Sequence, residues 1–199
     1  MKHFYRTIHG WFSFPKLYKS VVKRFGDNSH FVEVGTWLGK SAAYMAVEIL
    51  NSNKKIQFDC IDTWEGSLEH DQWGMDLTDL WDLFNHNLKD YIEDGSCVVH
   101  RGMSQDILPK LLSDGHQFDF IYVDGSHLAS DVIIDGVLSY LLLKTGGILA
   151  FDDYIFGVTD MRKYDIPHHA INFFDSAFID RGRVQRLGMN LMATYKKLE

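Results

Sequence analysis

Acidic side chains and a histidine follow two apolar stretches of this chain. Asp124 and His127 stand in the segment YVDGSH, and Asp152 and Asp153 end the segment ILAFDD. The apolar residues before each group are typical of buried β-strands. Neighbouring parallel strands lie about 4.8 Å apart, and open α/β sheets bind ligands at the carboxyl ends of their strands. We therefore expect these side chains to meet at one edge of a sheet.

Three carboxylates at one place repel one another unless a positive charge lies among them. A hard divalent cation with oxygen ligands supplies that charge. The sequence thus predicts a metal site formed by Asp124, Asp152 and Asp153. His127 can face the same cation or a substrate hydroxyl, or it can cap the helix that follows. The alternative for the Asp152–Asp153 pair is a solvated turn.

A glycine loop, EVGTWLGKS at residues 33–41, joins an expected strand to an expected helix. Gly35 permits a tight turn, and Gly39 permits the close approach of a ligand or of a helix. Asp62 ends the next expected strand, where a carboxylate can accept the hydroxyls of a ribose. This combination predicts an adenosine-type cofactor, either a nicotinamide dinucleotide or S-adenosylmethionine. Trp37 stands where a dinucleotide motif has its second glycine, which counts against the dinucleotide.

Strands and helices alternate along the chain, which predicts parallel strands joined by helical crossovers. Strands are expected at 30–35, 55–62, 97–102, 118–124 and 148–153, and helices at 14–25, 40–50, 78–92, 104–112, 128–143 and 167–179. Residues 183–197 read as two antiparallel strands around Gly188. We expect an α/β, Rossmann-like, doubly wound and mostly parallel seven-stranded sheet with an antiparallel C-terminal hairpin. Residues 1–199 are expected to form one domain, with an N-terminal helical segment at 1–28 and a core at 30–197.

Bulk properties exclude several classes of partner. The chain has 199 residues, a formal net charge of −7 and 46% hydrophobic residues. An acidic chain of this kind is not expected to bind nucleic acid, which requires a basic face. Cys60 and Cys97 have no metal-ligand spacing. The absence of a leader pattern and of an apolar membrane span predicts a cytoplasmic protein without membrane partners.

Five segments together resemble class I S-adenosylmethionine-dependent methyltransferases. They are EVGTWLGKSAAYMA, CIDTW, HRGMSQDILPKL, FDFIYVDGSH and LLLKTGGILAFDDY. Their order and spacing are most similar to small bacterial and phage-type enzymes with a VDGSH…GGxxxFDDY signature. That group resembles metal-dependent O-methyltransferases that act on catechols, on caffeoyl-CoA and on macrolide sugars. The resemblance covers residues 31–154 closely and extends loosely to Lys196. It implies O-methylation of a small hydroxylated acceptor, such as a sugar or a catechol-like compound.

The resemblance also implies which residues hold S-adenosylmethionine. These are Glu33, Gly35, Trp37, Gly39 and Ser41 around the methionine part, Asp62 at the ribose with Thr63 and Trp64 beside it, and Gly102, Met103 and Ser104 at the adenine. The bulk of Trp37 is tolerated in that family, where an aromatic side chain often fills the same position.

The metal and catalytic positions follow from the same resemblance. Asp124, Asp152 and Asp153 match the ligands of Mg²⁺ or a similar cation, and Asp-Asp followed by Tyr is the macrolide-sugar pattern, whereas catechol-type enzymes carry Asp-Asn. His127 occupies the position of a lysine that acts as general base in the catechol enzyme. A neutral imidazole suits proton abstraction near pH 7. The cation would lower the pKa of an acceptor hydroxyl and fix its direction. We therefore expect His127 and Asp124 to act in catalysis.

Acceptor recognition and the rival functions remain open at the level of sequence. Trp11, Phe12, Trp64 and Trp73 can stack on a sugar or aromatic ring, or they can be core or interface residues. A nicotinamide-dependent oxidoreductase would share the fold class but should carry G-x-G-x-x-G, which is absent. A non-catalytic S-adenosylmethionine-binding or assembly protein would keep the glycine loop and Asp62 but lose the carboxylate cluster. A homo-oligomer is possible.

Overall fold

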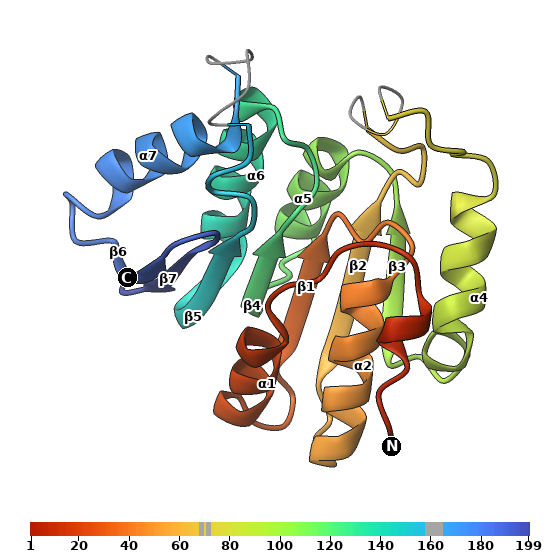
Figure 1. The fold of residues 1–199 in the computed structure, drawn as a ribbon. Coiled ribbons are helices and arrows are strands. Elements are labelled where there is room, and N and C mark those ends of the chain that lie inside the picture. Colours follow the sequence, from red (N-terminus) through yellow and green to blue (C-terminus); the bar gives the residue numbers. More distant parts are fainter. Residues whose placement is uncertain (68–69, 71–72, 158–164) are drawn as a thin grey trace. The chain divides into compact units, whose positions relative to one another are not determined.

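The computed structural model describes residues 1–67, 70, 73–157 and 165–199 (Figure 1). The chain divides into two compact units, Met1–Met103 and Ser104–Glu199, which are described separately below. The expectation of one domain across 1–199 stays a prediction. Within the described residues, no helix combines the length and the apolar character needed to cross a membrane.

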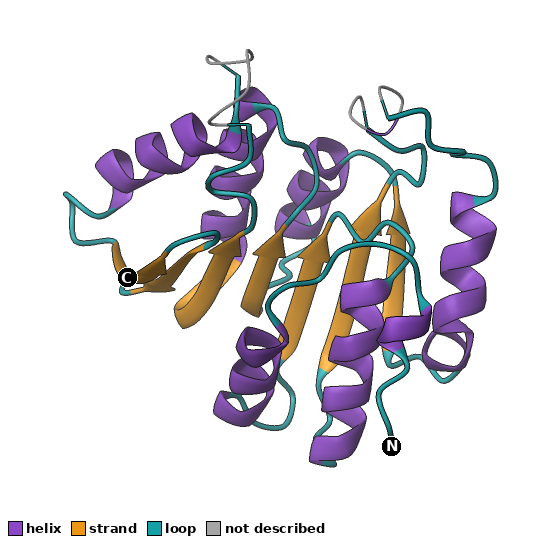
Figure 2. Ribbon diagram, in the orientation of Figure 1, coloured by secondary structure: helices purple, strands orange, loops and turns teal. Residues whose placement is uncertain are grey.

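The first unit contains a parallel set of three strands in the order β3-β2-β1 (Figures 1 and 2). Its elements are a 3-10 helix at Tyr5–Thr7, α1 at Pro15–Arg24, β1 at His30–Val34, α2 at Lys40–Ser52, β2 at Gln57–Asp62, α4 at Leu80–Glu93 and β3 at Cys97–Arg101. The register pairs Val34 with Ile61 and Asp62 with Arg101. The carboxyl ends of the three strands therefore lie at one edge.

Small and apolar side chains bring α2 close to its neighbours. Ala42, Ala43 and Met45 are completely buried, and the helix begins at Lys40, directly after Gly39. Helix α1 begins at Pro15, whose fixed φ suits a first helical turn. Its C-terminal end is capped by Lys54, whose Nζ donates to the carbonyls of Val22 and Phe25, at 2.6 Å each. A cation at this end of a helix also opposes the helix dipole.

The second unit has four strands in the order β4-β5-β7-β6. Its elements are α5 at Ser104–Ser113, β4 at Phe118–Val123, α6 at Ala129–Leu142, β5 at Leu143–Phe151, α7 at Pro167–Phe178, β6 at Val184–Met189 and β7 at Ala193–Lys197. Strands β4 and β5 are parallel, and β7 is antiparallel to both β5 and β6. Seven strands, mostly parallel and joined through helices, with an antiparallel C-terminal pair, confirm the predicted fold class.

Two predicted boundaries are wrong. Strand β5 begins at Leu143 directly after α6, rather than at residue 148. The pairing jumps from Phe118 with Leu143 to Phe120 with Ile148, so the intervening residues form an irregular stretch that contains Gly146 with φ +84°. Because glycine suits the left-handed cap of a helix, Gly146 and Gly147 are expected to stop the helix of 128–143 before the strand at 148–153. The glycine pair instead lies inside the strand.

The C-terminal hairpin turns later than predicted. Gly188 lies inside β6, where the pairing with β7 is irregular between Arg186 and Gly188. The turn occupies residues 190–192, where the amide of Asn190 donates to the carbonyl of Met192 at 3.1 Å. A glycine inside a strand often marks a bulge rather than a turn, and this is the case here.

Candidate active site

The glycine loop between β1 and α2 has an unusual backbone. Gly35, Trp37 and Gly39 have φ values of +85°, +44° and +81°. The left-handed region suits glycine but is strained for a tryptophan. Three hydrogen bonds hold the loop in this form: Asp62 Oδ2 accepts from the amides of Thr36 (2.8 Å) and Trp37 (2.7 Å), and the Trp64 indole donates to the Trp37 carbonyl (2.8 Å).

Asp62 lies at the end of β2, as predicted, and its carboxylate accepts hydrogen bonds from backbone amides. Besides the two amides on Oδ2, its Oδ1 accepts the amide of Trp64 at 2.8 Å. Each carboxylate oxygen can accept two hydrogen bonds. With the one Oδ1 donor found among the described residues, that oxygen retains an acceptor direction for a ribose hydroxyl. Asp62 is partly exposed, which is consistent with such access.

Gly39 makes room for a helix, and its expected contact with the cofactor stays a prediction. A Cβ atom at this position would lie 2.5 Å from Leu88 Cδ2 and 3.1 Å from Phe84 Cδ2, both on α4. Of the two close approaches that the sequence left open, the structure thus shows the one by a helix. Gly39 is also the N-cap of α2, a helix that begins without a side-chain cap.

Glu33 is completely buried in β1 and links two helices to the loop. It accepts hydrogen bonds from the Tyr18 hydroxyl of α1 at 2.8 Å and from the Ser41 hydroxyl of α2 at 2.5 Å. A buried carboxylate requires such donors, because the burial of an unpaired ion costs several kcal/mol, on the order of its desolvation penalty. The structure therefore brings Glu33 and Ser41 together, and their expected place around the methionine part of the cofactor stays a prediction.

The residues expected beside the ribose differ in exposure. Trp64 is 3% exposed and packs its ring against Trp81 and Phe84, with centroids 4.8 and 4.6 Å away. It is a core side chain that supports the loop, so it is not open to an acceptor ring. The Thr63 hydroxyl accepts the amide of Glu65 at 3.2 Å.

The residues expected at the adenine lie after β3. The Gly102 amide donates to the Asp62 carbonyl at 2.9 Å, with φ +152° at Gly102, and the Met103 side chain is 50% exposed. These two belong to the first unit, at the same strand edge as Asp62. Ser104 is the first residue of α5 in the second unit.

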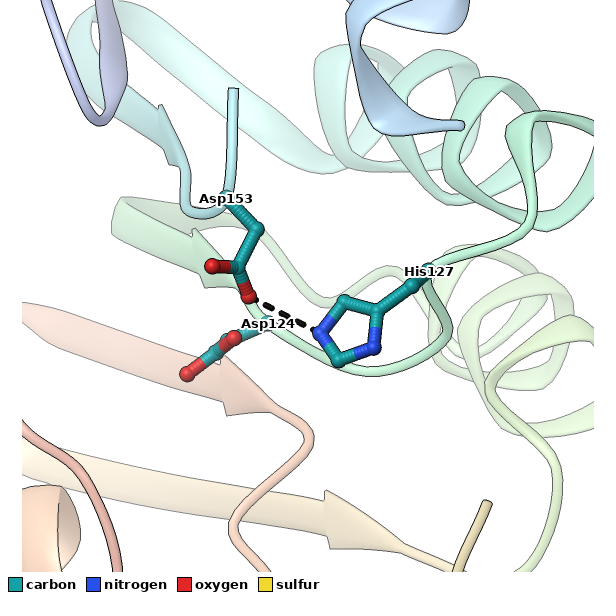
Figure 3. A group of neighbouring side chains, drawn as sticks. All are labelled: Asp124, His127 and Asp153. Carbon is teal, nitrogen blue, oxygen red and sulfur yellow. Dashed lines mark hydrogen bonds and ion pairs between the residues drawn. The ribbon is translucent and has the colours of Figure 1, made fainter. Parts of the chain in front are cut away.

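In the second unit, Asp124, His127 and Asp153 form a cluster at the ends of β4 and β5. Each offers one ligand atom, and these three atoms lie within 4.8 Å of one another. Figure 3 shows the carboxylates of Asp124 and Asp153 beside the imidazole of His127, which comes from the loop before α6. His127 Nε2 is 2.8 Å from Asp153 Oδ2, and its ring stacks on Phe156 with centroids 4.3 Å apart.

Asp152 faces a different set of partners from Asp153. Its Oδ2 accepts the Tyr122 hydroxyl at 2.5 Å, and its Oδ1 accepts the amide of Asp153 at 2.8 Å. Burial raises the pKa of Asp152 to about 6, and the charge of Asp153 adds to the effect. The structure therefore gathers His127 with Asp124 and Asp153, while Asp152 is bound to Tyr122. Both acids follow the end of β5 at Phe151, and Asp153 has φ +54°, a backbone conformation that the residue types alone do not predict.

Comparison with known proteins identifies a matching family. Residues 32–154 match the family described as methyltransferase domain. A curated relative, "Probable caffeoyl-CoA O-methyltransferase 3" of Dictyostelium discoideum, is 27% identical over 127 residues, which are 63% of this chain and 43% of the relative. The chain thus spans less than half the length of that relative.

Solved structures share the fold at low identity. The O-methyltransferase TomG from Streptomyces achromogenes, in complex with SAM, matches with a TM-score of 0.69 and 18% identity over 95% of this chain and 82% of that one. The methyltransferase MycE of the mycinamycin pathway, in complex with Mg and SAH, matches with a TM-score of 0.64 and 14% identity over 96% and 51%. The resemblance predicted from the sequence is confirmed by the family match, which covers more than half of the residues: this chain belongs to the methyltransferase domain family.

Proposed function

We propose that the protein is an S-adenosylmethionine-dependent O-methyltransferase that methylates a hydroxyl of a small acceptor with the help of a divalent cation. The observation that carries the proposal is the cluster of Asp124, His127 and Asp153 in a chain of the methyltransferase domain family. Two carboxylates and an imidazole could supply the two functions that metal-assisted O-methylation uses besides the methyl donor, namely a cation site and a base.

The first unit fits the cofactor at the glycine loop. The partly exposed Asp62 retains an acceptor direction on Oδ1, and it fixes the amides of Thr36 and Trp37 at the start of α2. The buried pair Glu33 and Ser41 holds the two ends of the loop together. Bound S-adenosylmethionine would supply an activated methyl group on sulfur. All of these cofactor assignments, including Gly102, Met103 and Ser104 at the adenine, stay predictions.

The second unit fits a divalent cation. Asp124 and Asp153 present carboxylate oxygens, the ligands that Mg²⁺ and Mn²⁺ prefer. Asp152, the third ligand expected from the sequence, would first have to release the hydroxyl of Tyr122. A bound cation would lower the pKa of an acceptor hydroxyl and neutralise the repulsion between the two carboxylates.

His127 is the base in this proposal. A carboxylate only accepts hydrogen bonds, so the nitrogen that faces Asp153, Nε2, carries a proton, and Nδ1 is then the nitrogen left to act as base. Nδ1 is buried, so the acceptor hydroxyl would have to displace the groups that cover it. Asp153 and the stacked ring of Phe156 hold the imidazole in one orientation. A base held in one orientation accelerates the reaction more than a freely rotating one, because no rotational entropy is lost when it aligns with the acceptor hydroxyl.

The test combines binding with turnover. S-adenosylmethionine is titrated by calorimetry, and transfer of labelled methyl to a panel of phenols and sugars is then followed with Mg²⁺, Mn²⁺ or chelator. We expect micromolar binding, turnover that chelator abolishes, and a loss of at least 100-fold in kcat for His127→Ala, as for a general base. The matched control is Asp106→Asn, an exposed acid of α5. Cofactor binding without turnover on any acceptor and without metal binding would instead favour the non-catalytic binding protein.

A further inference from the structure

A group of aromatic side chains lies on the glycine loop of the first unit. We call His9, Trp11, Trp37, His70 and Trp73 the aromatic platform. Trp11 stacks on Trp37 with ring centroids 5.4 Å apart and 17° between the planes, and His70 stacks on Trp37 at 5.0 Å and 9°. Trp73 meets Trp11 and His70 edge to face, at 5.9 and 6.1 Å. His9 lies 5.5 Å from Trp37.

The N-terminal part of the platform is fixed to the loop by two contacts. The Lys40 ammonium at the start of α2 donates to the carbonyl of Gly10 at 2.6 Å. Gly10 has φ +121°, and a Cβ atom there would lie 2.7 Å from the Trp37 ring. Only glycine allows this approach. The chain therefore holds Trp11 beside Trp37, a residue of the predicted cofactor loop.

The two outer indoles of the platform remain open to solvent. Trp11 is 64% exposed and Trp73 is 54% exposed, whereas Trp64 is 3% exposed. Phe12, the other aromatic residue considered from the sequence, packs on Tyr18 and Tyr44. Burial of a large apolar side chain is favourable, so two adjacent exposed indoles on a fixed support indicate a surface that a ligand covers.

The polar groups of the platform indicate which ligand fits. Two imidazoles contact the indoles, His9 those of Trp11 and Trp37, and His70 those of Trp37 and Trp73. The Nδ1 atom of His70 already accepts the amide of Ser67 at 3.1 Å, so its contribution to a ligand would come from the rest of the ring. A sugar ring has an apolar C–H face that can lie on an indole and a rim of hydroxyls that imidazoles can bind. A purely aromatic acceptor would be better served by an enclosed apolar pocket.

We propose that the aromatic platform binds a sugar ring of the methyl acceptor, with Trp11 and Trp73 as its stacking surfaces. This inference rests on the proposed function, of which it names the acceptor class and the acceptor-binding residues. Because Trp37 donates its amide to Asp62, the platform and the predicted cofactor site share one loop. A ring stacked there would lie next to the cofactor.

The experiment measures sugar binding directly, without turnover. Saturation-transfer NMR and tryptophan fluorescence are recorded with methyl glycosides of glucose, galactose and rhamnose, and in parallel with catechol. We expect at least one glycoside to bind and its affinity to fall at least tenfold in Trp11→Ala and in Trp73→Ala. Trp11→Phe should retain most of the affinity. The matched control is Phe173→Ala, which removes a side chain of α7 that is also 64% exposed.

The controls separate this inference from the proposed function. Thermal unfolding shows that each variant is folded, and calorimetry with S-adenosylmethionine reports the cofactor site independently of the platform. Retained cofactor binding with no glycoside binding, or with binding only to catechol, would overturn the inference and leave the proposed function standing. A concentration-dependent dimer that Trp11→Ala dissociates would also overturn it, because the indoles would then belong to a subunit interface. Failure of the wild-type protein to bind S-adenosylmethionine would contradict the proposed function and, with it, the acceptor role of the platform.

Discussion

Asp62 shows how a residue assigned to a ligand can first serve the protein itself. Its carboxylate accepts three backbone amides, those of Thr36, Trp37 and Trp64. Hydrogen bonds to a charged group contribute about 1.5–3 kcal/mol each. These bonds offset the strain of a tryptophan with φ +44°. The same side chain therefore fixes the loop that would meet the cofactor and offers its remaining acceptor direction to the ribose.

This double role predicts a coupled loss. Asp62→Ala should lower the free energy of unfolding by roughly 2–4 kcal/mol, because amides of the strained loop lose a charged acceptor. It should also abolish binding of S-adenosylmethionine. Urea unfolding and calorimetry measure the two effects. Asp76→Ala, which removes an exposed loop carboxylate that accepts the Thr78 amide at 3.0 Å, is the control. If Asp62→Ala lost cofactor affinity without a change in the free energy of unfolding, Asp62 would serve only to bind the ligand and not to stabilise the loop.

Asp135 is a buried acid that the proposed mechanism does not use. It lies on α6, is 1% exposed, and its Oδ1 finds no hydrogen-bond partner among the described residues. Burial raises its pKa to about 7, a hydrogen bond with Ser104 lowers it in part, and the charge of Asp131 raises it further. The folded protein thus binds this proton more tightly than the unfolded chain does.

The sign of the pH dependence follows from that difference. Between about pH 4 and pH 7 the folded state keeps a proton that the unfolded state has lost, so stability falls as the pH rises and levels off above pH 7. Asp135→Asn should remove this dependence and stabilise the protein at pH 8 by up to roughly 4 kcal/mol, at 1.36 kcal/mol per unit of pKa. Urea unfolding at pH 4.5 and pH 8 tests it, with Asp106→Asn as control. If Asp135→Asn changed the free energy of unfolding equally at both pH values, the raised pKa would not belong to Asp135.

At the scale of elements, the sequence predicts what local spacing and motif order determine. The three parallel strands of the first unit, the glycine loop and Asp62 at the end of β2 follow from hydrophobic runs and turn residues. The start of β5 does not, because Gly146 and Gly147 read as a helix stop, while pairing with β4 extends the strand back to Leu143. Long-range pairing overrides the local signal there.

The candidate site shows the same limit. The sequence identifies Asp124, Asp152 and Asp153, but it cannot show that the Tyr122 hydroxyl engages Asp152 and that His127 joins the other two. These contacts depend on which way neighbouring side chains point at the end of a strand. Likewise, Trp11 and Trp64 are both tryptophans near glycines, and only packing makes one exposed and the other buried.

Gly39 permits a prediction about how α2 and α4 pack. Gly39→Ala combines a left-handed φ of +81° with a Cβ position 2.5 Å from Leu88, whereas Gly115 has φ +82° and nothing within 4 Å. Gly115→Ala therefore measures the backbone strain alone, about 1 kcal/mol. We expect Gly39→Ala to cost a further 1–3 kcal/mol, roughly the cost of overpacking. Equal losses of unfolding free energy in the two variants would show that α4 does not press on the loop.

At the scale of the whole chain, the proposed chemistry is divided between the two units. The glycine loop, Asp62 and the aromatic platform belong to Met1–Met103, and the Asp124–His127–Asp153 cluster belongs to Ser104–Glu199. Cation binding and cofactor binding can therefore be perturbed separately by single substitutions. A ligand that binds the folded state alone stabilises it in proportion to the logarithm of its concentration over Kd, by about 2.7 kcal/mol at 100 times Kd.

Metal binding gives the last prediction. Mn²⁺ or Mg²⁺ should raise the melting temperature of the wild-type protein, and chelator should reverse the rise. Asp153→Asn should remove it, since this carboxylate lies in the cluster, and Asp152→Asn should weaken it less, since both oxygens of Asp152 already accept hydrogen bonds from Tyr122 and from the Asp153 amide.

The same variants are titrated with S-adenosylmethionine, and Asp106→Asn serves as the control. Cofactor affinity measured without metal should stay within about twofold in both cluster variants, because their side chains supply none of the predicted cofactor contacts. If Asp152→Asn abolished the metal-induced shift and Asp153→Asn did not, the cation would sit on the Tyr122 side of the pair, and Asp152 would have to exchange its tyrosine for the metal. If neither variant changed the shift, the cation would bind elsewhere, and His127 would have to deprotonate the acceptor without metal assistance.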